Sequence, residues 1–170
     1  DLTHHLGPSQ LDALAALGTA TIGEVAGGAV RILDPGIRPL AAQAARTAGY
    51  ALTVRCRPGD NLALHLALAQ VTVTEILMVD YGGSTSSGPF GEIMALAAKT
   101  RGARGLVIDG TVRDRTEIVA MGFPVFCRGT AIPGTTKQDR GHIGVGCTFG
   151  DIPIEQGNIV VADADAIVVF

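Results

Sequence analysis

The chain has 170 residues, of which 47% are hydrophobic and 17% charged, and it carries a net charge of −3. This length can enclose one hydrophobic core, and the high apolar content with low charge excludes an intrinsically disordered chain. Lys99 and Lys137 are the only lysines, and no apolar run reaches the roughly 18 residues of a membrane span, so we expect neither a nucleic acid nor a membrane as partner.

Hydrophobic periodicity and turn residues divide the chain into helices and strands. In chain order, the pattern predicts helices over 8–18 and 19–28, a strand over 49–57, a helix over 58–70, a strand over 75–83, a helix over 89–102, a strand over 104–110, a helix over 115–122, and strands over 123–129, 142–150, 157–164 and 165–170. Ser9 is the expected N-cap of the first helix and Gly18 its stop, and Asp60 or Asn61 is expected to cap the third helix.

The middle of the chain alternates strands and helices, which predicts parallel strands joined by right-handed crossovers. In the fourth helix Ile93 and Leu96 fall on one face. The strand-rich end argues against a simple doubly wound sheet, so we expect a mixed α/β fold. No repeat or linker interrupts the pattern, which predicts a single domain over 1–170. The apolar ending Ile167–Phe170 leads us to expect that a C-terminal segment is missing.

The three cysteines, Cys56, Cys127 and Cys147, are widely spaced and each lies in a strand-like run. An odd number without a CxxC pair predicts buried thiols in a reducing compartment rather than a disulfide framework. The N-terminus lacks the basic-then-apolar pattern of a secretion signal. We therefore expect a cytoplasmic location.

Two predicted strands end on an acid, Asp80 and Asp109, and each is followed by turn-forming sequence. Ligands of open α/β sheets bind beyond such strand ends. The loop after Asp80 leads into a helix N-terminus, which suits a carboxylate or phosphate, although it lacks the Walker and GxGxxG patterns. The alternative is that both acids simply form turns.

The run DGTVRDRTE, 109–117, is the most charged stretch of the chain. Asp114 and Glu117 are three residues apart and can share a helix face, where two carboxylates suit a hard divalent ion with several bound waters. Arg113 has the planar fork that binds a carboxylate at two points, and Glu92 begins the preceding helix. Alternatively, Asp114 caps its helix, and Glu117 and Glu92 complement helix dipoles.

The histidines give a weaker signal. His65 lies within an apolar helix and is interpreted as a packed residue, whereas His142 follows a charged loop and is a candidate site residue. No Ser-His-Asp or Cys-His pairing is indicated, and GxSxG is absent.

These residues also carry a family resemblance. Glu92, twenty further residues, Arg113-Asp114, two residues and Glu117 match the active-site pattern of the class II pyruvate aldolases typified by 4-hydroxy-4-methyl-2-oxoglutarate aldolase. That family also contains the regulator of ribonuclease E activity A. The resemblance extends from GTATIGEV to the last strand and includes PGDNLALHLAL and ILMVDYGG. The first acid of the pattern is usually Asp in the aldolases, whereas here it is Glu.

The resemblance implies a metal-dependent lyase. Asp114 would bind Mg²⁺ or Mn²⁺ directly, and Glu92 and Glu117 would hold metal-bound waters. Arg113 would bind the pyruvyl end of the substrate and stabilise the enolate. The implied reaction is retro-aldol cleavage of a 4-hydroxy-2-oxo acid to pyruvate, with oxaloacetate decarboxylation as a side activity. The alternative is a non-enzymatic binding protein like the ribonuclease E regulator.

The resemblance further implies that backbone N–H groups of Thr85, Ser86, Ser87 and Gly88 cradle the substrate carboxylate. It implies a mixed α/β sandwich around a β-barrel-like core, of the swivelling β/β/α type. The protein would assemble as trimers or dimers of trimers, with an acidic residue of a neighbouring subunit reaching the active site. We expect residues 128–144 to differ between members of the family and to determine which substrate is bound.

Overall fold

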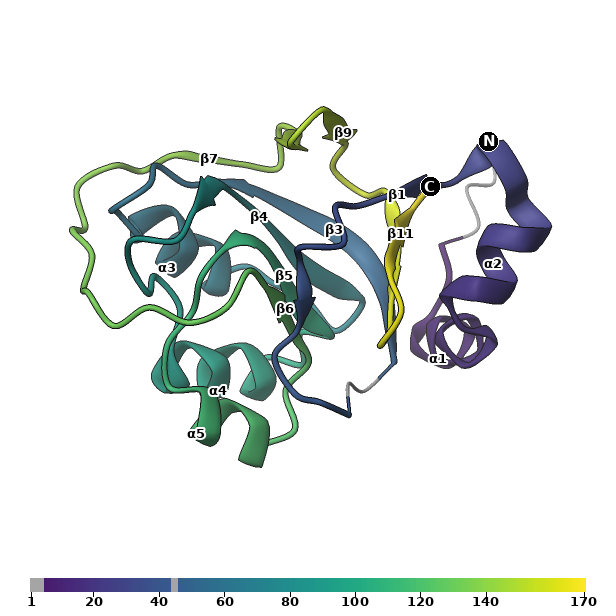
Figure 1. The fold of residues 1–170 in the computed structure, drawn as a ribbon, viewed down its shortest axis with the longest axis horizontal. Coiled ribbons are helices and arrows are strands. Elements are labelled where there is room, and N and C mark those ends of the chain that lie inside the picture. Colours follow the sequence, from purple (N-terminus) through teal and green to yellow (C-terminus); the bar gives the residue numbers. More distant parts are fainter. Residues whose placement is uncertain (1–4, 44–45) are drawn as a thin grey trace.

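A computed structural model describes residues 5–43 and 46–170, and these form a mixed α/β fold (Figure 1). The helices are α1 (Pro8–Leu17), α2 (Thr19–Ala26), the 3-10 turn η1 (Gly27–Ala29), α3 (Leu62–Leu68), α4 (Glu92–Thr100) and α5 (Arg115–Ala120). The strands are β1 (Arg31–Ile32), β2 (Arg38–Pro39), β3 (Thr47–Arg55), β4 (Glu75–Ser84), β5 (Gly105–Gly110), β6 (Val125–Cys127), β7 (His142–Ile143), β8 (Cys147–Phe149), β9 (Ile152–Ile154), β10 (Ile159–Ala162) and β11 (Ile167–Val169).

The main sheet has the strand order β1-β11-β10-β3-β4-β5-β6-β2, with β7 added to β3. Strands β3, β4, β5 and β6 pair in parallel, and the helices α3, α4 and α5 connect them in turn. The alternating pattern of the sequence predicted this arrangement. The other pairings in this sheet are antiparallel, and β8 and β9 form a separate hairpin. The prediction of a mixed fold rather than a simple doubly wound sheet is therefore confirmed.

The short strands are where the sequence prediction was incomplete. It did not contain β1, β2 or β9, which are two or three residues long, and it treated β7 and β8 as one strand. The N-cap of α1 is Gly7, with Pro8 as the first helical residue, so Ser9 was the wrong cap. Gly18 ends α1 as expected.

The sheet curls into a barrel-like core because its two edge strands are close in sequence. β1 pairs with β11 at one edge and β2 pairs with β6 at the other, yet only residues 33–37 separate them. A connection of this length spans at most about 20 Å, so both edges must approach one another. Leu33 and Ile37 of this connection are buried in one cluster with Val107, Phe126 and Val169.

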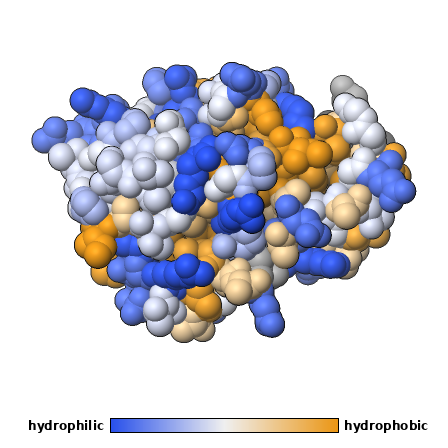
Figure 2. Space-filling model, viewed as in Figure 1, coloured by the Kyte–Doolittle hydropathy of each residue, from blue (hydrophilic) through white to orange (hydrophobic). Residues whose placement is uncertain are grey.

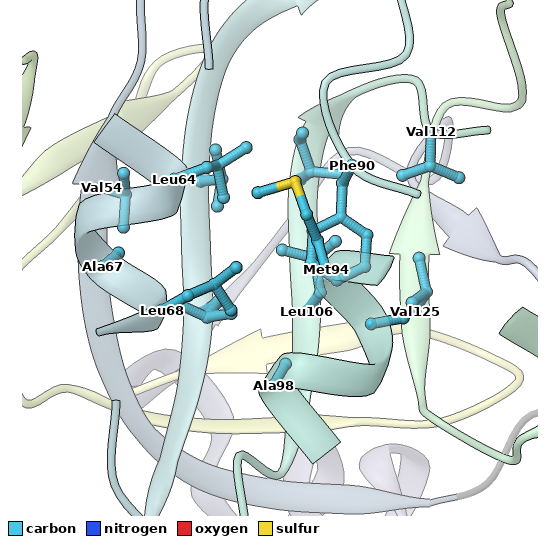
Figure 3. Packing of buried hydrophobic residues seen from close by; sticks show 14 of the residues in the cluster. Val54, Leu64, Ala67, Leu68, Phe90, Met94, Ala98, Leu106, Val112 and Val125 are labelled. Carbon is cyan, nitrogen blue, oxygen red and sulfur yellow. The ribbon is translucent and has the colours of Figure 1, made fainter. Parts of the chain in front are cut away.

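The face of the sheet that points away from this cluster is covered by α3, α4 and α5 (Figure 1), and Figure 3 shows the packing of α3 and α4. Leu64 and Leu68 of α3 lie over β3 and β4, and Met94 of α4 lies beside Phe90 and Leu106. β5 is buried along its whole length because apolar side chains cover both of its faces. The parallel strands thus end at a rigid edge, beside the starts of α4 and α5.

All three cysteines are buried, as predicted. Burial raises the pKa of Cys56 and of Cys147 to about 12. Both thiols therefore stay protonated at neutral pH and act as small core residues.

The face of α4 that carries Ile93 and Leu96 points away from the core, because Met94, Ala95 and Ala98 fill the buried side. Ile93 is 84% exposed and Leu96 is 56% exposed. Figure 2 shows a separate apolar area over β1 and β11, where Ile32 is also exposed. Within the described residues, no helix is long and apolar enough to cross a membrane.

Asp60 fastens the long loop after β6 to the start of α3. Its carboxylate accepts hydrogen bonds from Thr136 Oγ1 (2.6 Å), from the N–H of Gln138 (2.7 Å) and from the N–H of Leu62 (2.9 Å). Burial acts to raise the pKa of this carboxyl, but the hydrogen bonds outweigh it and lower the pKa to about 2. Asp60 rather than Asn61 therefore supplies the side-chain cap of α3.

We expect Asp60→Asn to destabilise the protein by about 1–3 kcal/mol at pH 7, because one acceptor oxygen becomes a donor amid N–H groups. The charged form of Asp60 is favoured by folding, so its stabilisation is present above the unfolded pKa of about 4 and is lost towards pH 2. Thermal unfolding of both proteins from pH 7 to pH 3 measures this difference, which should shrink in acid. Asp12→Asn, at an exposed ion pair with Arg104, is the control and should change stability by less than about 1 kcal/mol.

Candidate active site

The charged corner between β5 and α5 is tied to two other loops. Thr111 Oγ1 donates to the Ser87 carbonyl (2.7 Å), and the Arg113 N–H donates to the Phe90 carbonyl (2.9 Å). The Val112 N–H donates to the carbonyl of Gly129, after β6. These bonds fix the backbone of Arg113 between the loop before α4 and the loop after β6.

Asp114 has an unusual backbone conformation at the start of α5. Its φ is 60° and its ψ 45°, and among the described residues it is the only one other than glycine with a positive φ. Residues held in this region tend to occur where surrounding contacts impose them, often at functional sites. The conformation turns the Asp114 side chain away from its own helix.

The carboxylate of Asp114 instead meets the start of α4. Its Oδ2 accepts a hydrogen bond of 2.9 Å from the N–H of Glu92, the first residue of α4. The guanidinium Nε of Arg113 lies 3.9 Å from the same oxygen. The side chain of Asp114 therefore does not cap α5, since it forms no hydrogen bond to an N–H of that helix. It accepts a hydrogen bond from a free N–H at the start of α4 instead.

Two glycines allow this close approach. A Cβ on Gly91 would overlap Oδ2 of Asp114, and a Cβ on Gly88 would overlap the Ala131 carbonyl oxygen and crowd Arg113. Positions 88 and 91 must therefore be glycine, because any side chain there would displace Arg113 or Asp114.

Arg113 and Asp114 lie in the wall of a cavity of about 300 Å³. Its lining is Asn61, His65, Gly88, Pro89, Gly91, Ile93, Met94, Arg113, Asp114, Gly134, Thr135 and Lys137. A second hollow, of about 390 Å³, lies on their other side and includes Arg115, Thr130, Ala131 and Ile132. The side chains of Arg113 and Asp114 are 48% and 39% exposed, so a small molecule can reach both.

The predicted substrate loop divides into three parts. Gly88 lines the cavity with Arg113 and Asp114, and its N–H donates to the Pro133 carbonyl (2.9 Å). Ser87 is buried, with its hydroxyl 2.8 Å from the Tyr81 hydroxyl. Thr85 and Ser86 are exposed at the surface. Gly88 is thus the residue of this loop that the structure brings to the cavity wall.

The two predicted water-holding acids have different positions. The backbone of Glu92 lies beside the Asp114 carboxylate, and Glu117 lies in the first turn of α5, three residues after Asp114. Both side chains are exposed. Among the described residues, neither Glu92 nor Glu117 belongs to the lining of the two hollows.

The donor set suits a divalent ion that keeps most of its water. The described part of the chain contains no group of three or more His, Cys, Asp or Glu side chains placed to enclose a metal. Asp114 nevertheless offers a carboxylate that is anchored through the Glu92 N–H and reaches solvent. Mg²⁺ is commonly bound through one or two carboxylates plus waters and substrate oxygens, so these residues fit such an ion.

The acids at the strand ends have structural roles. Asp109 is buried and forms an ion pair with Arg128 (Nε to Oδ1, 2.5 Å), which also contacts Asp34 at 3.0 Å. Burial opposes the charge on Arg128, but the two carboxylates outweigh this effect and raise its pKa. Asp80 accepts a hydrogen bond from the Gly82 N–H in its own turn. Asp80 therefore makes the hydrogen bond of a turn, although it lies within β4, whereas Asp109 lies in β5 and forms an ion pair instead of a turn.

Three residues of the cavity were not expected from the sequence. Asn61 was considered only as a helix cap, and Lys137 only as a loop lysine. His65 was interpreted as packed, but its side chain is exposed and lines the cavity. Partial burial and then the charge of Lys137 lower the pKa of His65, so it is neutral at pH 7. No pattern in the sequence marked these three residues as neighbours.

Known proteins resemble this chain in sequence and in fold. The chain is 37% identical over 122 residues to a Halalkalibacterium halodurans protein named "Putative 4-hydroxy-4-methyl-2-oxoglutarate aldolase"; the match covers 72% of this chain and 58% of that protein. A Geobacillus kaustophilus structure named S-adenosylmethionine: 2-dimethylmenaquinone methyltransferase has a TM-score of 0.83 and 30% identity, covering 89% of this chain and 92% of the other.

A third similar protein is Streptomyces coelicolor RraAS2, described as an unusual member of the RNase ES inhibitor RraA protein family. Its TM-score is 0.81 at 26% identity, with 97% of this chain and 86% of the other covered. A sequence model of the RraA-like family, described as Aldolase/RraA, matches residues 19–169. The fold, the charged corner and this match together place the chain in the RraA-like family.

Proposed function

We propose that the chain catalyses divalent-metal-dependent retro-aldol cleavage of a 4-hydroxy-2-oxo acid, of the 4-hydroxy-4-methyl-2-oxoglutarate type, to pyruvate. The observation that carries this proposal is the Asp114 carboxylate, held by the Glu92 N–H beside Arg113 in the wall of a 300 Å³ cavity. An anchored carboxylate next to a guanidinium suits a substrate that carries a carboxylate and a keto oxygen. The name of the Halalkalibacterium relative points to the same reaction.

In this reaction Arg113 binds the pyruvyl end of the substrate. The C3–C4 bond breaks, its electrons move to C3 to form the pyruvate enolate, and the C4 hydroxyl loses its proton as C4 becomes a carbonyl. A guanidinium carries a positive charge and a planar fork of donors, so Arg113 can stabilise the enolate charge. The enolate then takes a proton at C3 to give pyruvate. Oxaloacetate yields the same enolate when it loses CO₂, which makes decarboxylation an expected side activity.

Mg²⁺ or Mn²⁺ would be held directly by Asp114, with Glu92 and Glu117 contacting its waters. When bound, the ion would act as a Lewis acid on the 2-oxo group. The substrate carboxylate would lie towards Thr85, Ser86, Ser87 and Gly88, of which Gly88 borders the cavity.

We further propose that the site is completed by a subunit interface in a homotrimer or hexamer. Ile93 is 84% exposed in the rim of the first hollow, and Ile132 is 85% exposed in the rim of the second. Leu96 on α4 and Val119 on α5 are exposed as well. Clustered apolar side chains of this kind mark protein contacts more often than isolated ones.

The second candidate is a binding protein without catalytic activity. It is favoured by the similarity to RraAS2, described as a member of the RNase ES inhibitor RraA protein family. A methyltransferase is not proposed, because the sequence lacks a glycine-rich strand-loop-helix with a following acid that would suit S-adenosylmethionine. The assay below separates the first two candidates.

Purified protein should release pyruvate from 4-hydroxy-4-methyl-2-oxoglutarate and from oxaloacetate with Mg²⁺ or Mn²⁺, and EDTA should abolish both reactions. Coupled reduction of pyruvate measures the rates, and metal-dependent thermal stabilisation reports binding independently of turnover. Absent or metal-independent turnover by correctly folded protein would falsify the aldolase proposal and favour the binding protein.

Asp114→Ala should reduce turnover to background and remove the thermal stabilisation by Mg²⁺, because the direct ligand is lost.

Arg113→Lys should lower kcat about 100-fold or more, since a point charge does not replace a fork that contacts two oxygens. Steady-state kinetics and thermal unfolding measure both variants. Arg101→Lys, on the surface at the end of α4, is the matched control and should behave as wild type. Near-normal kinetics of Arg113→Lys would show that Arg113 is structural.

The double substitution Ile93→Glu/Ile132→Glu should shift the protein to a smaller assembly and reduce turnover, because it places charges in the proposed subunit contact. Sedimentation equilibrium measures the mass, with Val25→Glu as control for an equally exposed apolar residue on α2. An unchanged mass with the double variant would contradict an interface at this place.

A further inference from the structure

One atom of the cavity wall lacks a partner. Among the described residues, Oδ1 of Asn61 is the only buried side-chain nitrogen or oxygen atom that makes no hydrogen bond. Asn61 as a whole is only 6% exposed. Buried polar atoms are nearly always paired, because an unpaired one loses its hydrogen bonds to water without replacement. An acceptor left in this state at a cavity wall therefore indicates a position where a ligand supplies the donor.

The orientation of the Asn61 side chain is determined by its neighbours. Nδ2 donates to the Pro89 carbonyl at 2.9 Å and lies 3.8 Å from the Met94 sulfur. Rotating the amide would place Oδ1 against the carbonyl oxygen of Pro89, where two acceptors repel. The backbone of Asn61 is also held, because its N–H donates to the Thr136 carbonyl (3.0 Å) and its carbonyl accepts from the His65 N–H (3.2 Å). Oδ1 is thus a fixed acceptor.

Asn61 and the charged corner line the same cavity from different elements. Asn61 lies directly before α3, whereas Arg113 and Asp114 precede α5. Met94, which contacts the Asn61 amide, lies on α4 between them and next to Phe90 (Figure 3). A ligand bound at Arg113 therefore extends into a space whose wall carries an acceptor.

We propose that Oδ1 of Asn61 accepts a hydrogen bond from the C4 hydroxyl of the substrate. This inference rests on the proposed aldolase function. At neutral pH the carboxylate and keto oxygens of a 2-oxo acid only accept hydrogen bonds, so the C4 hydroxyl is the donor that a 4-hydroxy-2-oxo acid brings. Asn61 then positions the O–H bond whose proton leaves when C3–C4 breaks, while the proton itself goes to a separate base.

The proposal makes Asn61 a residue that selects between two substrates. Oxaloacetate carries a carboxylate at C4 and no hydroxyl donor, so Asn61 contributes nothing favourable to its binding. A site that has a fixed buried acceptor disfavours molecules that leave it unpaired. Asn61 should therefore matter for aldol cleavage and not for decarboxylation, whereas Arg113 and Asp114 should matter for both.

The test compares kcat/KM for 4-hydroxy-4-methyl-2-oxoglutarate with kcat/KM for oxaloacetate in the same Mg²⁺-loaded protein. Asn61→Ala should lower kcat/KM for 4-hydroxy-4-methyl-2-oxoglutarate, relative to kcat/KM for oxaloacetate, about tenfold or more. This change corresponds to about 1.4 kcal/mol, and turnover of oxaloacetate should stay near the wild-type rate. Met94→Leu alters the packing beside the amide without removing an acceptor, so any effect should be equal on both substrates.

A second measurement uses wild-type protein and so does not depend on a variant that folds. In wild-type protein, the 2-oxo acid that has hydrogen in place of the C4 hydroxyl should bind more weakly than the 4-hydroxy-2-oxo acid. Equal affinities in wild type, or equal losses for both substrates in Asn61→Ala, would overturn the assignment of Asn61 while leaving the aldolase intact. Absence of both reactions in wild type would overturn the aldolase function and this assignment with it.

Discussion

The hydrogen bond from the Glu92 N–H to the Asp114 carboxylate determines the geometry of the site. It joins the first residue of α4 to the residue before α5, so two consecutive strand-to-helix connections meet at one oxygen. Asp114 reaches this position because of its left-handed backbone, and Gly91 leaves room for it. The Nε of Arg113 lies 3.9 Å from the oxygen that accepts this bond. A structural cap and a candidate metal ligand are thus one side chain.

Much of this arrangement could be predicted from the sequence, because local patterns control it. The parallel strands, the helices between them and the pairing of Arg113 with Asp114 follow from periodicity and from adjacent positions in the chain. The prediction failed at β1, β2 and β9, where two or three residues carry too little pattern and long-range pairing decides the structure. The shared face of Ile93 and Leu96 on α4 was predicted, but its outward direction was not, since periodicity does not indicate where a face points.

The remaining cavity wall could not be predicted, because it comes from segments distant in sequence. Asn61 and His65 belong to α3 and its start, while Lys137 lies more than seventy residues later. In the sequence, Asn61 could not be distinguished from an ordinary helix cap. Its unpaired oxygen becomes visible only when Asp60 is found to supply the cap and Pro89 to bind the amide nitrogen. The role that we propose for Asn61 depends on Asp60 performing the structural one.

The loop after β6 is held at two places by hydrogen bonds, and its cavity-facing residues lie outside these anchors. Ala131 and Pro133 bond to the segments around Arg113, and Thr136 and Gln138 bond to Asp60. Between and beside these anchors, Gly134, Thr135 and Lys137 face the cavity and form no part of the core. These positions can therefore change without altering the path of the loop, so exchange of a few side chains would alter which molecules the cavity accepts.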